Sequence, residues 1–142
     1  MKKNMFILSL FVILVLTGCS GFNNLKDGYY TAEMSEFSHG WKEYLLIQVK
    51  DGSIVSAEFN AKDESGFIKA WDNSYMKNMS MVQDTYPNKY TREYVQQLLE
   101  EQSDIQVDAI SGATTSGNNF KKLVQAVLEQ AETGNSETVV VE

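Results

Sequence analysis

The chain has 142 residues, of which 43% are hydrophobic and 22% charged, and its formal net charge is −7. A chain of this length suits one domain rather than several. The acidic balance argues against nucleic acid as a partner, because phosphates attract basic surfaces. One cysteine, Cys19, and one histidine, His39, exclude a disulfide framework and a zinc site of cysteine and histidine ligands, so we expect no metal site.

The start of the chain has the pattern of a secretion signal. Lys2 and Lys3 precede an apolar run over residues 5–16, interrupted only by Ser9. A bilayer span needs about 20 apolar residues, so this run is too short to be one. A buried core helix is the alternative, but the two lysines and the position at the start of the chain favour a signal.

The apolar run ends in Leu16-Thr17-Gly18-Cys19, which resembles the lipobox of bacterial lipoproteins. The resemblance implies that residues 1–18 are a signal peptide and that Cys19, the new first residue, is lipidated. Residues 19–26 would then form a short lipidated tether. The lipid would anchor the chain at the extracytoplasmic face of the cell membrane.

Two β-rich runs predict an antiparallel hairpin. Residues 44–49 and 54–59 flank an Asp51-Gly52 step, and Asp-Gly is a strong hairpin signal because glycine adopts a positive φ at little cost. Residues 29–31 favour an extended segment before the hairpin.

The second half of the chain has mostly helical spacing. Apolar residues predict a short helix near residues 67–80 and an amphipathic helix over 92–102, with a turn at 86–88 between them. Residues 105–110 are compatible with a short strand.

The last helix has the clearest pattern. Its apolar residues recur at helical spacing, at Phe120, Leu123, Val124, Val127, Leu128 and Ala131. Gly134 is expected to end it. We expect a flexible tail over residues 133–142, with the alternative that Val139–Val141 pair at a sheet edge. Together these elements predict one small α+β domain, an antiparallel sheet packed with two or three helices.

The segment that leads into this helix carries the chemistry. Four hydroxyl side chains and two glycines lie within residues 111–117. Hydroxyl residues before a helix cap its free N–H groups, and the same N–H groups favour a phosphate. Composition alone leaves both a simple helix cap and a phosphate site open.

The order of the residues is more specific than their composition. Residues 108–116 read Asp-x-x-Ser-Gly-Ala-Thr-x-Ser, which resembles the motif of FMN-binding domains related to the C subunit of sodium-pumping NADH:quinone oxidoreductase. Softer similarities lie upstream, at Asp27–Tyr30, Gly40–Lys42, Lys50–Gly52 and residues 66–79. The resemblance covers residues 27–132, which would form the FMN-binding domain.

The resemblance implies FMN as the cofactor. In this family FMN is commonly joined by a phosphoester to the hydroxyl at the last motif position, which is Ser116 here, and a flavin transferase donates it from FAD. Many members have threonine at that position, but serine offers the same hydroxyl. Thr115 is the other candidate, since a shift of one residue in register would place it there.

The other motif residues would surround the phosphate and form the sequence that the transferase recognises: Asp108, Ser111, Gly112, Ala113 and Thr114. The flavin ring needs an aromatic or apolar bed, and we expect Trp41 and Trp71 to be the first candidates for it. His39 is more consistent with a surface turn than with an acid or base.

The resemblance implies an electron carrier rather than a stand-alone enzyme. The sequence has no Gly-x-Gly-x-x-Gly fingerprint of a nicotinamide site. A lipid-anchored flavoprotein would take electrons from a quinone-linked membrane donor. Two alternatives stay open: a lipoprotein that binds flavin noncovalently for scavenging or delivery, and a flavin-free adhesion or binding lipoprotein.

Overall fold

The computed structural model describes residues 24–142. The predicted signal peptide, Cys19 and most of the predicted tether lie outside the described residues. In chain order the elements are β1 (Gly28–Met34), β2 (Lys42–Lys50), β3 (Ser53–Lys62), η1 (Lys69–Trp71), α1 (Asn73–Ser80), α2 (Pro87–Glu101), η2 (Gln102–Asp104), α3 (Thr114–Thr133) and β4 (Val139–Val141).

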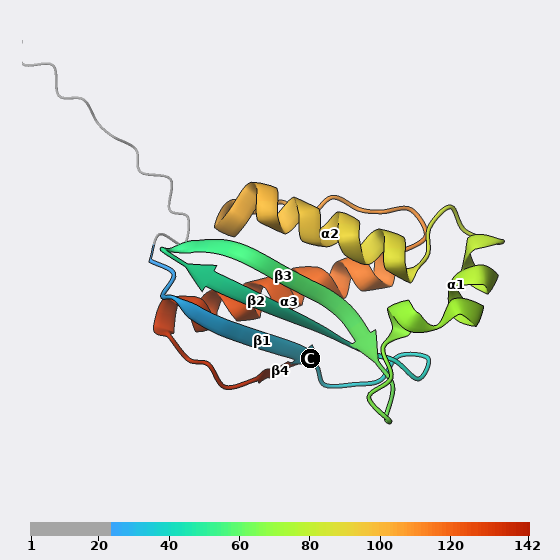
Figure 1. The fold of residues 1–142 in the computed structure, drawn as a ribbon, viewed down its shortest axis with the longest axis horizontal. Coiled ribbons are helices and arrows are strands. Elements are labelled where there is room, and N and C mark those ends of the chain that lie inside the picture. Colours follow the sequence, from blue (N-terminus) through green and yellow to red (C-terminus); the bar gives the residue numbers. More distant parts are fainter. Residues whose placement is uncertain (1–23) are drawn as a thin grey trace, which may run out of the picture.

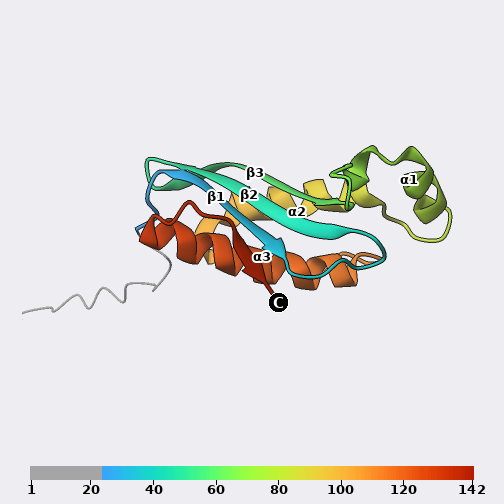
Figure 2. The same cartoon turned by 90° about the horizontal axis from the view of Figure 1, so that it is seen from below.

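The four strands form one sheet in the order β3-β2-β1-β4. The pairs β1/β2 and β2/β3 are antiparallel, whereas β4 runs parallel to β1 at the edge. Helices α2 and α3 pack side by side against one face of the sheet, and α1 lies beyond its end (Figures 1 and 2). The predicted α+β class is therefore confirmed.

The predicted hairpin is confirmed and joins β2 to β3. Asp51 has a φ of 52° and Gly52 a φ of 74°, and Lys50 pairs with Ser53 across the turn. A two-residue turn with positive φ at both positions matches the right-handed twist of the strands.

The core lies between the sheet and the two long helices. Tyr94 of α2 stacks on Phe120 of α3 with ring centroids 5.2 Å apart. The ring centroid of Phe59 in β3 lies 4.8 Å from that of Phe120. The predicted apolar stripe of the last helix is confirmed, because all six of its residues are buried: Phe120, Leu123, Val124, Val127, Leu128 and Ala131. Gly134 ends this helix in the left-handed conformation, as predicted.

Two predicted boundaries were wrong. The helix expected near residues 67–80 is divided at Asp72, whose side chain accepts a hydrogen bond from the Tyr75 N–H at 2.9 Å and so begins α1. The turn expected at residues 86–88 is the start of α2. Pro87 occupies its first turn, where a missing N–H costs nothing.

The two ends of the domain are more structured than the sequence predicted. Val139–Val141 pair with β1, so the alternative of a sheet edge is correct for these residues and the expected flexible tail is not. Residues 105–110 form no strand. Near the other end, Leu25 is buried and the Lys26 N–H donates to the Ala131 carbonyl at 2.8 Å, so the end of the predicted tether is docked on α3.

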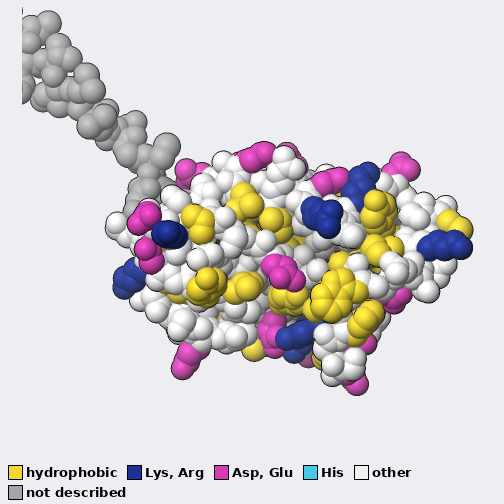
Figure 3. Space-filling view, in the orientation of Figure 1, with side chains coloured by type: hydrophobic (Ala, Val, Ile, Leu, Met, Phe, Trp, Pro, Cys, Tyr) yellow, Lys and Arg dark blue, Asp and Glu magenta, His cyan; other side chains and the backbone are white. Residues whose placement is uncertain are grey.

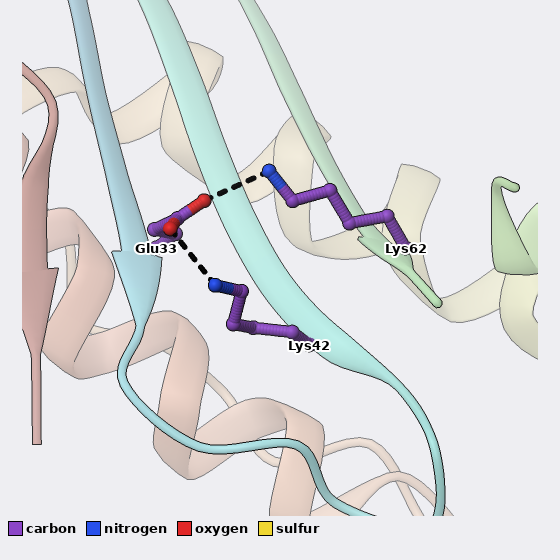
Figure 4. A network of polar contacts seen from close by, with 3 residues as sticks. All are labelled: Glu33, Lys42 and Lys62. Carbon is purple, nitrogen blue, oxygen red and sulfur yellow. Dashed lines mark hydrogen bonds and ion pairs between the residues drawn. The ribbon is translucent and has the colours of Figure 1, made fainter. Parts of the chain in front are cut away.

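The face of the sheet opposite the helices carries mixed hydrophobic and charged side chains (Figure 3). Here Glu33 of β1 accepts hydrogen bonds from Lys42 of β2 at 2.9 Å and Lys62 of β3 at 2.8 Å (Figure 4). The hydrogen bond from Lys62, followed by that from Lys42, lowers the pKa of Glu33. Within residues 24–142, no helix is long and apolar enough to cross a membrane.

Candidate functional site

Three of the four hydroxyl residues of the motif lie inside the last helix rather than before it. Thr114, Thr115 and Ser116 form the first turn of α3, and Ala113 precedes them as the N-cap residue. Among residues 24–142, no side chain caps this end of the helix. The hydroxyl groups therefore do not act as a helix cap, and the first N–H groups of α3 remain free for a ligand.

A cavity of about 320 Å³ lies at this end of α3. It is enclosed by the start of β2 and the loop before it, by η1 and α1, and by the first turns of α2 and α3. The lining residues are Ser38, His39, Trp41, Glu43, Lys69, Tyr75, Met79, Tyr90, Gly112, Ala113, Thr114, Thr115, Ser116 and Asn119.

Ser116 meets a buried carboxylate in this cavity. Its hydroxyl donates to Glu43 Oε1 at 2.5 Å, and the Asn119 amide donates to Glu43 Oε2 at 2.7 Å. Ser116 is 9% exposed and Glu43 8%. An O–H···O distance of this length is typical of a charge-assisted hydrogen bond.

A buried cation faces the same cavity between two aromatic rings. Lys69 is 9% exposed, and its Nζ lies 4.6 Å from the ring centroid of Tyr75 and 5.9 Å from that of Trp41. The two rings meet edge to face at 6.1 Å. Among residues 24–142, no carboxylate forms an ion pair with Lys69. Its charge is therefore available to an anionic ligand.

Tyr94 of α2 contacts the segment that begins α3. Tyr94 accepts a hydrogen bond from the Ile110 N–H at 3.3 Å and donates to the Ala113 carbonyl at 3.4 Å. A Cβ on Gly117 would overlap the Tyr94 hydroxyl, so glycine allows this close approach. Burial raises the pKa of the Tyr94 hydroxyl.

Burial is also the largest cause that raises the pKa of Tyr90, which lines the cavity, and the charge of Glu43 adds to it. The neighbouring Ser116 hydroxyl acts in the opposite direction. Because the pKa rises from an ordinary value of 10.0, both tyrosines are protonated at neutral pH. They contribute hydroxyl groups and no charge to the site.

Most of the predicted site residues meet in the cavity. Gly112–Ser116 and Trp41 line it, and so does His39, which was expected only at a surface turn. Ser111 is exposed and immediately precedes the lining residues.

Besides Ser111, two more of the predicted residues do not line the cavity. Asp108 is exposed, and its N–H donates to Gln97 Oε1 at 2.9 Å. Trp71 is 67% exposed and packs against Phe67 on the outer surface, so Tyr75 is the residue that accompanies Trp41.

The sequence reasoning missed Glu43, Lys69 and Asn119. Glu43 could have been found, because it occupies an inward position in the alternation of β2, where the neighbouring inward residues are apolar. A carboxylate at such a position signals a polar partner across the core.

The model of the FMN-binding domain family matches residues 40–129, which include the whole cavity lining except Ser38 and His39. The chain belongs to this family. FMN is therefore its cofactor, as the motif predicted.

The chain is also similar to proteins of known sequence or structure. The chain is 31% identical over 140 residues to the 15 kDa lipoprotein of Treponema pallidum (strain Nichols), covering 98% of this chain and 97% of that protein. A crystal structure of a Clostridium perfringens protein superposes with a TM-score of 0.76 at 42% identity, covering 82% of this chain and 97% of the other. A solution structure of a Clostridium thermocellum protein has a TM-score of 0.50 at 30% identity. The match covers 76% of this chain and 93% of the other.

The residues of the cavity fit this cofactor. The uncapped start of α3 and Lys69 suit a phosphate, and the rings of Trp41 and Tyr75 suit a planar aromatic group. Within residues 24–142, no group of three or more His, Cys, Asp or Glu side chains is placed to hold a metal ion.

Proposed function

We propose that this chain is a lipid-anchored flavoprotein at the extracytoplasmic face of the cell membrane. It carries FMN through a phosphoester to Ser116 and relays electrons. The lipobox at Leu16–Cys19 supports the anchor, and so does the relative named as a lipoprotein, whose match covers 98% of this chain. A flavin transferase is the partner for attachment, and a quinone-linked membrane protein is the electron donor.

The placement of Ser116 carries the proposal. It is the last residue of the motif, it lies in the cavity, and its hydroxyl is held by Glu43 beside the free N–H groups of α3. Thr115 is exposed on the same turn, and no side chain of residues 24–142 accepts a hydrogen bond from it. This contrast favours Ser116 over Thr115 as the attachment residue.

The bound flavin would supply one- and two-electron redox chemistry, and the protein would bind, orient and tune it. Lys69 would hold negative charge, while Trp41 and Tyr75 would exclude water from one side. His39, Thr114 and Thr115 line the cavity and are exposed, so a redox partner could approach from their side. These features support an electron carrier.

Attachment can be tested on a denaturing gel. The full chain is expressed together with the transferase, denatured in acid, and scanned for flavin fluorescence. We expect a fluorescent band for the wild type and none for Ser116→Ala, with Thr115→Ala labelled like the wild type. A wild-type protein that is yellow before denaturation but gives a dark band would contradict attachment and support noncovalent binding.

A further inference from the structure

Glu43 is a carboxylate that the packing of the core does not explain. It comes from β2, whose other inward-facing residues are the apolar Leu45, Ile47 and Val49. A buried carboxylate is costly unless hydrogen bonds or an opposite charge compensate for its lost hydration. Among residues 24–142, Glu43 forms no ion pair with a basic side chain.

The compensation comes from one face of α3. Ser116 and Asn119 are three residues apart, so their side chains lie on the same side of the helix, and each donates to a different oxygen of Glu43. Asn119 fixes the carboxylate from one side and leaves Oε1 directed at the Ser116 hydroxyl. The geometry is that of a nucleophile, a base and a group that orients the base.

We propose that Glu43 is the general base that accepts the Ser116 proton during attachment of FMN, and that Asn119 is its positioning residue. The inference rests on the proposed function, because it assigns a role within the attachment of FMN to Ser116. The acceptor chain would thus supply part of its own modification chemistry, and the transferase would supply the flavin donor.

The step balances with FAD as the donor. Ser116 Oγ forms a bond to the phosphorus of the FMN half, and the bond from that phosphorus to the bridging oxygen breaks. AMP leaves with the electron pair of the broken bond. The Ser116 proton passes to Glu43 Oε1 and then to water, and nothing is oxidised or reduced.

The other ionisable groups of the cavity are poorer bases. Lys69 is a cation held against aromatic rings, and Tyr90 and Tyr94 are protonated because burial raises their pKa. His39 is exposed, and its Nδ1 is hydrogen-bonded to Ser38 at 3.1 Å. Among the described residues, Glu43 is the carboxylate that accepts a hydrogen bond from the Ser116 hydroxyl.

The test measures the initial rate of flavin labelling of the full chain in detergent. The unlabelled protein is mixed with purified transferase and FAD. Glu43→Gln keeps the size of the side chain but removes the base, and we expect its rate to fall about 100-fold, which is typical for loss of a general base. Glu33→Gln is the matched control, since it removes a carboxylate from the opposite face of the sheet, and it should be labelled at the wild-type rate.

The pH dependence separates catalysis from a structural role. Hydroxide can replace a missing base. The ratio of the wild-type labelling rate to the Glu43→Gln labelling rate should therefore shrink as the pH rises. The role of Glu43 as a base would be overturned if this ratio stayed constant with pH, or if Glu43→Gln were labelled at a rate within twofold of the wild type. If Glu43→Gln does not fold, Glu43→Ala serves the same comparison, and a wild-type labelling rate in that variant, which has no carboxylate at this position, would also overturn it.

Labelling of the wild type distinguishes failure of this inference from failure of the proposed function. If the wild type accepts no FMN, then attachment at Ser116 fails and the role of Glu43 fails with it. If the wild type is labelled and Glu43→Gln is labelled equally fast, only the role of Glu43 fails.

Discussion

At the scale of single residues, Lys69 is a buried cation of the cavity and would tune a flavin bound there. A buried ammonium without a carboxylate partner interacts with a ligand charge more strongly than an exposed one, because water screens it less. Reduced flavins carry more negative charge than oxidised flavin. Lys69 should therefore stabilise the reduced form and raise the midpoint potential.

We predict that Lys69→Gln lowers the two-electron midpoint potential by about 30 mV, which corresponds to about 1.4 kcal/mol of lost stabilisation of the reduced form. The measurement is a spectroelectrochemical titration of the FMN-loaded protein. Lys77→Gln on the exposed side of α1 is the control and should leave the potential unchanged. An unchanged potential in Lys69→Gln would show that Lys69 does not sense the charge of the flavin.

The motif residues could be predicted from sequence because they are contiguous. Gly112–Ser116 lie on one turn of the chain, so their order alone indicated their chemistry. Glu43 is 73 positions from Ser116, and their contact exists only because β2 packs against α3. Trp71 was chosen for its residue type, but η1 turns Lys69 into the cavity and leaves Trp71 at the surface.

At the scale of elements, Glu33 connects three strands on the open face of the sheet. Its hydrogen bonds to Lys62 and Lys42 stabilise the ionised form and lower its pKa below the ordinary value of 4.5. The folded-state pKa is thus below the unfolded one. Glu33 contributes stability above the unfolded pKa, and this contribution is lost as the pH falls through the folded pKa.

We predict that Glu33→Gln lowers the free energy of unfolding at pH 7 by no more than about 1 kcal/mol, because solvent screens these partly exposed pairs. The difference from the wild type should shrink below the ordinary pKa and with added salt. Urea denaturation at several pH values measures it. A difference that stays the same in acid would mean that packing, and not charge, is responsible.

The elements differed in how well the sequence predicted them. The β2–β3 hairpin and the buried stripe of α3 follow from local signals, which are an Asp-Gly turn and helical spacing. The edge strand β4 depends on pairing with β1, more than a hundred residues away, so no local pattern could decide it. Pro87 was interpreted as a turn, although proline suits the first turn of a helix equally well.

At the scale of the whole molecule, the net charge of the chain is unfavourable for the binding of a free anionic cofactor. The net charge is −7, and a free FMN phosphate is an anion, so charge alone disfavours its binding. A covalent ester makes the local concentration of the flavin permanent, the limiting case of an intramolecular interaction. At the membrane exterior, where free flavin is dilute, attachment would thus keep the carrier loaded.

Ser116 is the proposed attachment residue for FMN, and peptide mapping tests this assignment most directly. The full chain, purified from cells that express the transferase, is digested, and the flavin-bearing peptide is fragmented in a mass spectrometer. We expect fragments that contain Ser116 to carry the added mass of FMN less one water, and fragments that end at Thr115 to carry no added mass. FMN on Thr115, or peptides of residues 108–121 without flavin from a yellow protein, would contradict it.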